Sequence, residues 1–146
     1  HRLSDQPDNM PLNVGQMLLS PTRTYLPLLR DVLSDYRNDI RGIVHNTGGG
    51  QTKVEHFIKE MDVVNNSLLP IPPVFRLIQT QHSADWKEMF QVFNMGCRLE
   101  VYTGQNTAEE LLALGRKYNI EAQVIGRVEE GRGQVRLETE QGKFEY

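Results

Sequence analysis

The sequence predicts a mixed α/β (α+β) domain in which helices pack on a mixed β-sheet. Short apolar segments alternate along the chain with longer segments whose apolar residues recur at helical spacing. Gly, Pro and Asn residues separate these segments, and no internal repeat or low-complexity run interrupts them. A chain of 146 residues, 38% of them hydrophobic, is long enough for one domain with its own core.

The first 19 residues are expected to be an irregular lead-in, because they contain Pro7, Pro11 and Gly15 and show no clear period. Ser20 and Pro21 then combine an N-cap with a proline at the first helical position, which predicts a helix that continues to residue 36. The other expected helices are a short one over residues 54–59, one over 74–81 started by Pro73, one capped by Ser83, and one with a capping box formed by Thr107 and Glu110.

The expected strands are short runs rich in β-branched and apolar residues, at 40–44, 63–64, 99–103, 122–128 and 134–139. The last two runs flank a Gly-Arg-Gly sequence at 131–133, which is typical of a turn. We therefore expect them to close the sheet as a directly paired antiparallel hairpin. Trp86, Met89, Phe90 and Phe93 recur at helical spacing and are expected in the core rather than in a binding site.

Composition excludes several classes of function. The net charge is −3 and no block of Lys or Arg occurs, which argues against a nucleic-acid or anionic-membrane surface. Cys97 is the only cysteine, so no internal disulfide is possible and no zinc-binding spacing exists. No apolar run is long enough to span a bilayer, and a reducing cytoplasm is the expected location.

The most informative run follows the strand at 40–44: His45, Asn46 and Thr47 precede Gly48, Gly49 and Gly50. We call residues 46–50 the glycine loop. Three consecutive glycines cost conformational entropy, and the usual gain is close backbone approach to an anion such as a phosphate. The loop has neither the P-loop lysine nor the dinucleotide-binding spacing. The alternatives are a tight turn leaving the strand, with a histidine that hydrogen-bonds a neighbouring carbonyl.

A second candidate segment lies where a helix is expected to give way to a strand. There Asn94 can donate to a ligand and Gly96 can allow close backbone approach. The alternative is a left-handed helix C-terminus formed by these two residues, and from the sequence alone this alternative is favoured. No catalytic triad, acid–base carboxylate pair or metal-ligand spacing can be identified.

Three runs occur in the order and spacing of one known family. They are Leu-Ser-Pro-Thr-Arg-Thr-Tyr at 19–25, His-Asn-Thr-Gly-Gly-Gly at 45–50 and Glu-Met-Phe-Gln-Val-Phe-Asn-Met-Gly at 88–96. The run Ala-Gln-Val-Ile-Gly-Arg-Val at 122–128 is similar to a late strand of the same family. From about residue 15 onward, the chain resembles the phosphoribosylformylglycinamidine cyclo-ligases, the aminoimidazole ribonucleotide synthetases of purine biosynthesis.

The resemblance implies a three-layer α/β/α C-terminal domain of a two-domain, homodimeric enzyme. Residues 1–19 would be the lead-in from an N-terminal ATP-binding domain, and residues 20–146 the C-terminal domain. ATP and Mg²⁺ would be bound mainly by the N-terminal domain, with formylglycinamidine ribonucleotide as the substrate of ATP-dependent ring closure. The C-terminal domain alone would be inactive.

The resemblance also implies roles for individual residues. Thr47 and the three glycines would hold a phosphate, His45 would orient the substrate or move a proton, and Thr22 and Arg23 would assist, with Arg23 as the cation. Asn94 and Gly96 would line the same cleft.

The chain departs from the family pattern at 54–57, at Gln91 and at Cys97–Arg98, which puts a phosphate role for the segment behind the loop in doubt. Two alternatives stay open. One is a related ATP-using enzyme, such as a thiamine-monophosphate kinase, a selenophosphate synthetase or a hydrogenase maturation factor. The other is a non-catalytic module that binds a phosphorylated metabolite.

Overall fold

The computed structural model describes residues 2–8 and 10–146; two positions of the expected lead-in, His1 and Asn9, lie outside them. The helices are α1 (Val14–Leu18), α2 (Leu26–Asp35), the 3-10 helix η1 (Gly50–Phe57), α3 (Pro73–His82), α4 (Trp86–Val92) and α5 (Gln105–Lys117). The strands are β1 (Ile40–His45), β2 (Met61–Asn65), β3 (Leu99–Thr103), β4 (Gly126–Glu130), β5 (Val135–Thr139) and β6 (Gly142–Glu145). The predicted α+β class is confirmed.

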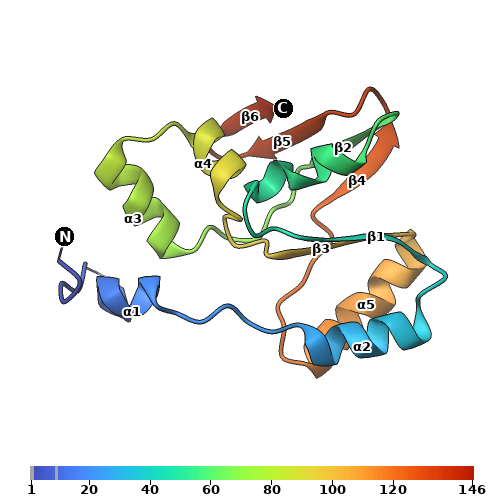
Figure 1. Ribbon diagram of the computed structural model, residues 1–146, viewed down its shortest axis with the longest axis horizontal. Helices are drawn as coiled ribbons and strands as arrows, with labels where there is room; N and C mark the ends of the chain where they lie inside the picture. The colour runs from blue at the N-terminus through green and yellow to red at the C-terminus, as the bar shows by residue number, and fades with distance from the viewer. Residues whose placement is uncertain (1, 9) are drawn as a thin grey trace.

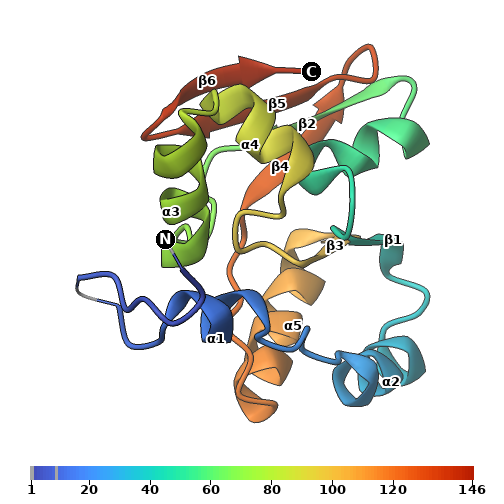
Figure 2. The ribbon, with the colours of Figure 1, turned by 60° about the vertical axis from the view of Figure 1, so that its left-hand side comes forward.

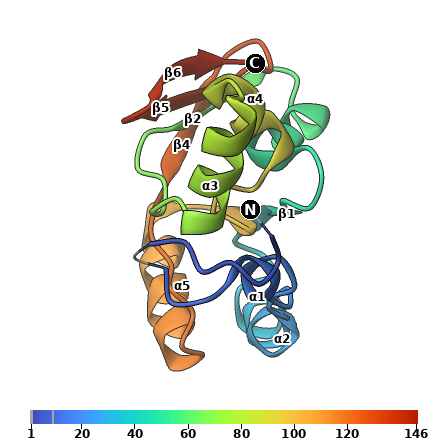
Figure 3. The same cartoon turned by 90° about the vertical axis from the view of Figure 1, so that its left-hand side faces the viewer.

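The strands form two sheets. β1 and β3 make an antiparallel pair, the β1–β3 ribbon, in which Val44 lies opposite Glu100 and His45 opposite Leu99. The other four strands form a mixed sheet in the order β4-β2-β5-β6, with β2 antiparallel to β4 and parallel to β5. Figures 1 to 3 place this four-stranded sheet on one side of the β1–β3 ribbon and helices α2 and α5 on its other side.

The main core lies between the four-stranded sheet and helices α3, α4 and η1. Its buried members are Val44, Val54, Val63, Met89, Phe90, Met95, Val135 and Leu137. Trp86 and Phe93 pack against this cluster, so the expected core role of the aromatic helix α4 is confirmed. The glycine loop runs from the end of β1 to the start of η1, and therefore joins the ribbon to this core.

The expected hairpin of the last two long strands is wrong. β2 lies between β4 and β5, so these strands are not neighbours although a short turn joins them. The reason is burial: Val63 and Val64 of β2 are almost completely buried and pair with strands on both sides. The hairpin that does form joins β5 to β6, with Thr139 opposite Gly142.

Four predicted helix starts are also displaced. The short helix expected over residues 54–59 is a 3-10 helix that begins at Gly50 and ends at Phe57. The first long helix begins at Leu26 rather than beside Pro21, and Pro27 fits its first turn. Ser83 ends α3 in a left-handed conformation (φ 49°) instead of capping α4, whose N-cap is Asp85. Helix α5 begins two residues before Thr107, so the capping box with Glu110 does not form. Residues 14–18, which were expected to be irregular, form helix α1. Its N-terminus is capped by reciprocal hydrogen bonds between Asn13 and Gln16.

Candidate functional site

The glycine loop needs glycine because of its backbone conformation. Gly48, Gly49 and Gly50 have φ values of 70°, 78° and 49°. Residues with a Cβ rarely adopt this left-handed region, whereas glycine enters it without steric cost. Three successive residues of this kind turn the chain sharply from β1 into η1.

The glycines differ in what surrounds them. A Cβ on Gly50 would lie 2.4 Å from the carbonyl oxygen of Phe90 and 2.7 Å from that of Phe93, so this glycine lets η1 approach the end of α4. A Cβ on Gly48 would meet nothing within 4 Å. Gly48 and Gly49 are exposed, and within the described part of the chain their N–H groups form no hydrogen bond. The part of the loop open to a ligand is therefore its first two glycines.

Two buried amides hold the loop at its ends. Asn46 Nδ2 donates to the carbonyl oxygen of Cys97 at 3.1 Å and to Glu100 Oε1 at 2.6 Å. Gln51 Nε2 donates to the carbonyl oxygens of Asn94 at 2.6 Å and of Cys97 at 3.3 Å. Both amides thus bind the segment between α4 and β3. Sequence reasoning missed this anchoring, although a polar residue on either side of the glycines was its signal.

His45 and Lys53 order the exposed side of the loop. His45 Nδ1 lies 3.1 Å from Thr47 Oγ1, so the ring is paired with a hydroxyl rather than with the expected carbonyl. Lys53 Nζ donates to the carbonyl oxygens of His45 at 3.0 Å and of Thr47 at 3.1 Å. Lys53 is therefore a cation in contact with the loop, and sequence reasoning did not identify it.

Two arginines border the same region. The ring of Tyr25 meets that of His45 edge-on, with centroids 6.0 Å apart and an interplanar angle of 69°. Burial raises the pKa of Tyr25, while the nearby charges of Arg98 and Arg23 oppose this effect. Arg23 Nη2 also donates to the carbonyl oxygen of Tyr118 at 3.1 Å.

The electrostatics of the region are positive. Among the described residues, neither arginine nor Lys53 forms an ion pair with a carboxylate. Thr22 precedes Arg23 on the exposed segment between α1 and α2.

The segment with Asn94 and Gly96 forms a left-handed turn, as favoured from the sequence, although Met95 and Gly96 are its left-handed residues. Asn94 Oδ1 accepts from the N–H of Gly96 at 3.0 Å. A Cβ on Gly96 would lie 2.9 Å from Pro72 Cδ, so this glycine admits the linker between β2 and α3.

An anion at this site would meet free backbone N–H groups, nearby cations and the imidazole of His45. Over the described ranges, no cluster of His, Cys, Asp and Glu side chains is placed to hold a metal ion. None of the described helices is long and apolar enough to cross a bilayer.

Residues 2–138 match the protein family described as "AIR synthase related protein, C-terminal domain". The chain is similar to phosphoribosylformylglycinamidine cyclo-ligases, with 37% identity to that of Methanococcus vannielii over 80% of this chain and 33% of that protein. It is 35% identical to that of Caldicellulosiruptor saccharolyticus, over 89% of this chain and 38% of that protein. The chain thus spans about a third of the length of these relatives.

Two solved structures share the fold. Escherichia coli HypE, a hydrogenase maturation protein, superimposes with a TM-score of 0.62 at 22% identity, over 92% of this chain and 44% of HypE. A HypE structure in complex with ATP gives a TM-score of 0.64 at 17% identity, over 91% of this chain and 45% of HypE.

Proposed function

The chain belongs to the AIR synthase related protein family as its C-terminal domain, and on that premise we propose that it serves a phosphoribosylformylglycinamidine cyclo-ligase. The complete enzyme closes the imidazole ring of aminoimidazole ribonucleotide, with release of ADP and phosphate. Because this chain spans about a third of its relatives, the activity is that of a longer protein with a further, N-terminal domain. That protein acts in the cytoplasm as a homodimer.

The observation that carries the proposal is the exposed pair Gly48 and Gly49, whose free N–H groups lie in a loop that Lys53 contacts. Fixed backbone donors bind an oxyanion without reorganisation, so they suit a phosphate group of the ribonucleotide or the phosphate in transfer. Thr47 is exposed beside them and adds a hydroxyl donor.

His45 is the proposed catalytic residue. Its bond to Thr47 fixes the ring and leaves Nε2 as the atom that orients the substrate or moves a proton. Arg23 and Arg98 add positive charge on the Tyr25 side, and Thr22 contributes a second hydroxyl. Asn94 and Gly96 shape the wall of the cleft.

ATP, held with Mg²⁺ mainly by the N-terminal domain, supplies the activation of the formyl oxygen that an internal nitrogen then displaces. The residues described above fit an anion because they offer N–H donors and cations. Within the described part of the chain, no carboxylate forms an ion pair with those cations. They do not by themselves form a metal site. The role of this domain is therefore to bind, orient and hold or move a proton at His45.

The test is ADP release by the complete protein, with and without formylglycinamidine ribonucleotide. We expect substrate-dependent release, and a fall of about 100-fold or more in kcat/KM for His45→Gln with a native circular dichroism spectrum. His82→Gln, an exposed histidine at the end of α3, is the matched control and should keep full activity. ADP release that does not depend on this substrate would refute the proposal and favour a related ATP-using enzyme.

A further inference from the structure

A cavity of about 260 Å³ lies between β3, helices α2 and α5, and residues 120–126. Its walls are largely apolar and include Leu28 and Val32 of α2 and Leu111 and Leu112 of α5. An apolar cavity of about 150 Å³ holds one benzene molecule, so this one is large enough for a ring with a polar head group.

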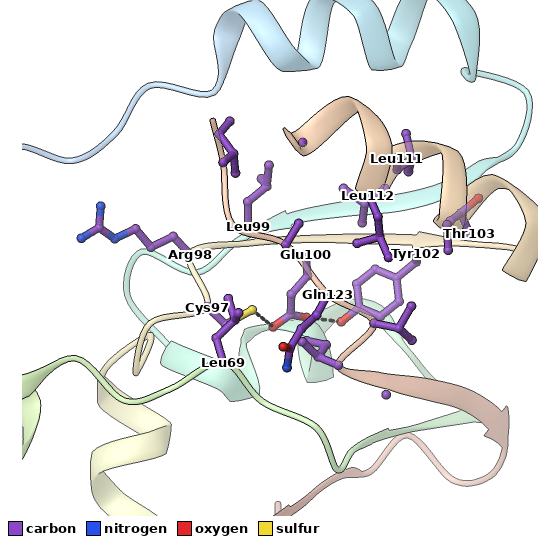
Figure 4. Close-up of a pocket in the computed structure, with 18 of the residues that line it drawn as sticks. Leu69, Cys97, Arg98, Leu99, Glu100, Tyr102, Thr103, Leu111, Leu112 and Gln123 are labelled. Atoms are coloured by element: carbon purple, nitrogen blue, oxygen red, sulfur yellow. Dashed lines mark hydrogen bonds between the residues drawn. The ribbon is translucent and has the colours of Figure 1, made fainter. Parts of the chain in front are cut away.

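One wall of the cavity carries a buried carboxylate. Glu100 is 5% exposed. Figure 4 shows its side chain between Cys97 and Tyr102. It accepts hydrogen bonds from Asn46, Cys97 and Tyr102, and no described Lys, Arg or His forms an ion pair with it. Arg98 lines the cavity, but its side chain extends away from the carboxylate. Burial raises the pKa of Glu100, so its ionised form needs a nearby cation, which these neutral donors do not supply.

A second buried polar side chain lines the cavity. Asn65, 2% exposed at the end of β2, lines the cavity, and its Nδ2 has no hydrogen-bond acceptor among the described residues. An unpaired buried amide donor costs free energy unless a ligand or water supplies an acceptor. The cavity therefore combines an apolar interior, a buried carboxyl group without a cation and a donor without an acceptor.

We propose that this cavity binds a small amphiphilic cation, an amidinium or ammonium compound whose head group pairs with Glu100 and whose apolar part lies between α2 and α5. An acceptor on the ligand pairs with Asn65. A planar amidinium fits best because it donates two parallel N–H bonds to a carboxylate and brings the missing charge. His45, Gly48 and Gly49 do not line this cavity, although Tyr25, Gly96 and Arg98 do. The proposal does not depend on the function proposed above.

The test uses benzamidine as the probe and benzamide, its uncharged analogue of similar shape, as the comparison. Isothermal titration calorimetry on the chain is expected to show saturable benzamidine binding about tenfold or more tighter than benzamide binding, as one charge-assisted pair provides. Glu100→Gln should reduce that preference to about threefold or less. Glu109→Gln, an exposed glutamate on α5, should leave it unchanged.

A second variant separates the cavity from the protein surface. Leu112→Phe enlarges a lining side chain and should weaken binding of both probes, with the charge of the protein unchanged. It also keeps the proposal testable if Glu100→Gln fails to fold. Equal binding of benzamidine and benzamide, or benzamidine binding that neither variant weakens, would overturn the proposal.

Discussion

Asn46 and Glu100 meet behind the glycine loop, where the Asn46 amide donates to the Glu100 carboxylate at 2.6 Å. The two residues come from the neighbouring strands β1 and β3 or their immediate ends, and both are at least 95% buried. Asn46 is the first residue of the glycine loop, and Glu100 lines the cavity. The two sites thus share a buried support, and Tyr25, Gly96 and Arg98 border both.

We expect Asn46→Ala to lower the free energy of unfolding by about 2–3 kcal/mol, because it leaves a buried carboxylate without its amide donor. Urea unfolding followed by circular dichroism measures the change. Asn66→Ala, at an exposed position after β2, is the matched control and should change stability by less than about 0.5 kcal/mol. A loss as small as this for Asn46→Ala would show that the contact adds nothing to stability.

The glycine loop should respond differently at its two ends. Gly50→Ala places a Cβ 2.4 Å from a backbone oxygen of α4 and should destabilise the domain by more than about 3 kcal/mol or prevent folding. Gly48→Ala enters open space and should cost only the strain of a left-handed residue, about 1–2 kcal/mol. Thermal and urea unfolding of both variants checks this. Similar losses at the two positions would contradict the distinction.

The stability of the protein should fall at acid pH because Asp62 accepts hydrogen bonds from the turn between β4 and β5. Backbone N–H bonds from Gln134 and Arg132, more than the charge of Arg136, hold the pKa of Asp62 below its usual value. A carboxyl with a lowered native pKa stabilises the fold fully above its unfolded pKa of about 3.9, and this contribution is lost as the pH falls through the native pKa.

Asp62→Asn should therefore destabilise the protein near neutral pH and flatten the fall in stability below about pH 4. Urea midpoints measured from pH 2 to 7 give this profile. Asp35→Asn, on the exposed face of α2, should leave the profile unchanged. An Asp62→Asn profile parallel to that of the unmodified chain would show that the turn does not depend on the charge.

Cys97 should be chemically inert in the folded chain. Burial, with the nearby carboxylate of Glu100, raises the pKa of the Cys97 thiol to about 12, and the side chain is 4% exposed. Because the thiolate is the reactive form, Ellman's reagent at pH 8 should not react with the native protein. One equivalent should react in guanidinium chloride. Rapid reaction without denaturant would mean that the segment between α4 and β3 opens readily.

Local patterns in the sequence predicted much of the fold. The strands at Ile40–His45 and Leu99–Thr103 and the helix Pro73–His82 were found because their apolar periodicity and proline signals are short-range. The insertion of β2 between β4 and β5 was missed because pairing over long sequence distances is set by burial, which no local pattern contains. Helix starts shifted for a related reason: a capping residue is a signal only when the chain enters the helix there.

For the site, the sequence identified the glycines but not what they make room for. Gly50 and Gly96 admit the protein's own backbone and a proline ring, whereas Gly48 faces open space, and all of them have the same side chain. Lys53 was missed because its contact with the loop depends on the turn of η1. Glu100 was missed because its burial follows from the pairing of β3 with β1.

The position of β5 has a consequence for synthesis. Val135 and Leu137, which are completely buried, belong to a strand near the end of the chain that lies in the interior of the sheet beside β2. Chains emerge from the ribosome in order from the N-terminus, so β2 must wait for both of its partners, β4 and β5, until residues 126–139 have been made. During that interval the backbone N–H and C=O groups of this apolar strand have no neighbouring strand to pair with. The nascent domain is therefore most exposed to aggregation before residues 126–139 have emerged, and deletion of the interior strand Val135–Thr139 should be far more damaging than deletion of the edge strand Gly142–Glu145.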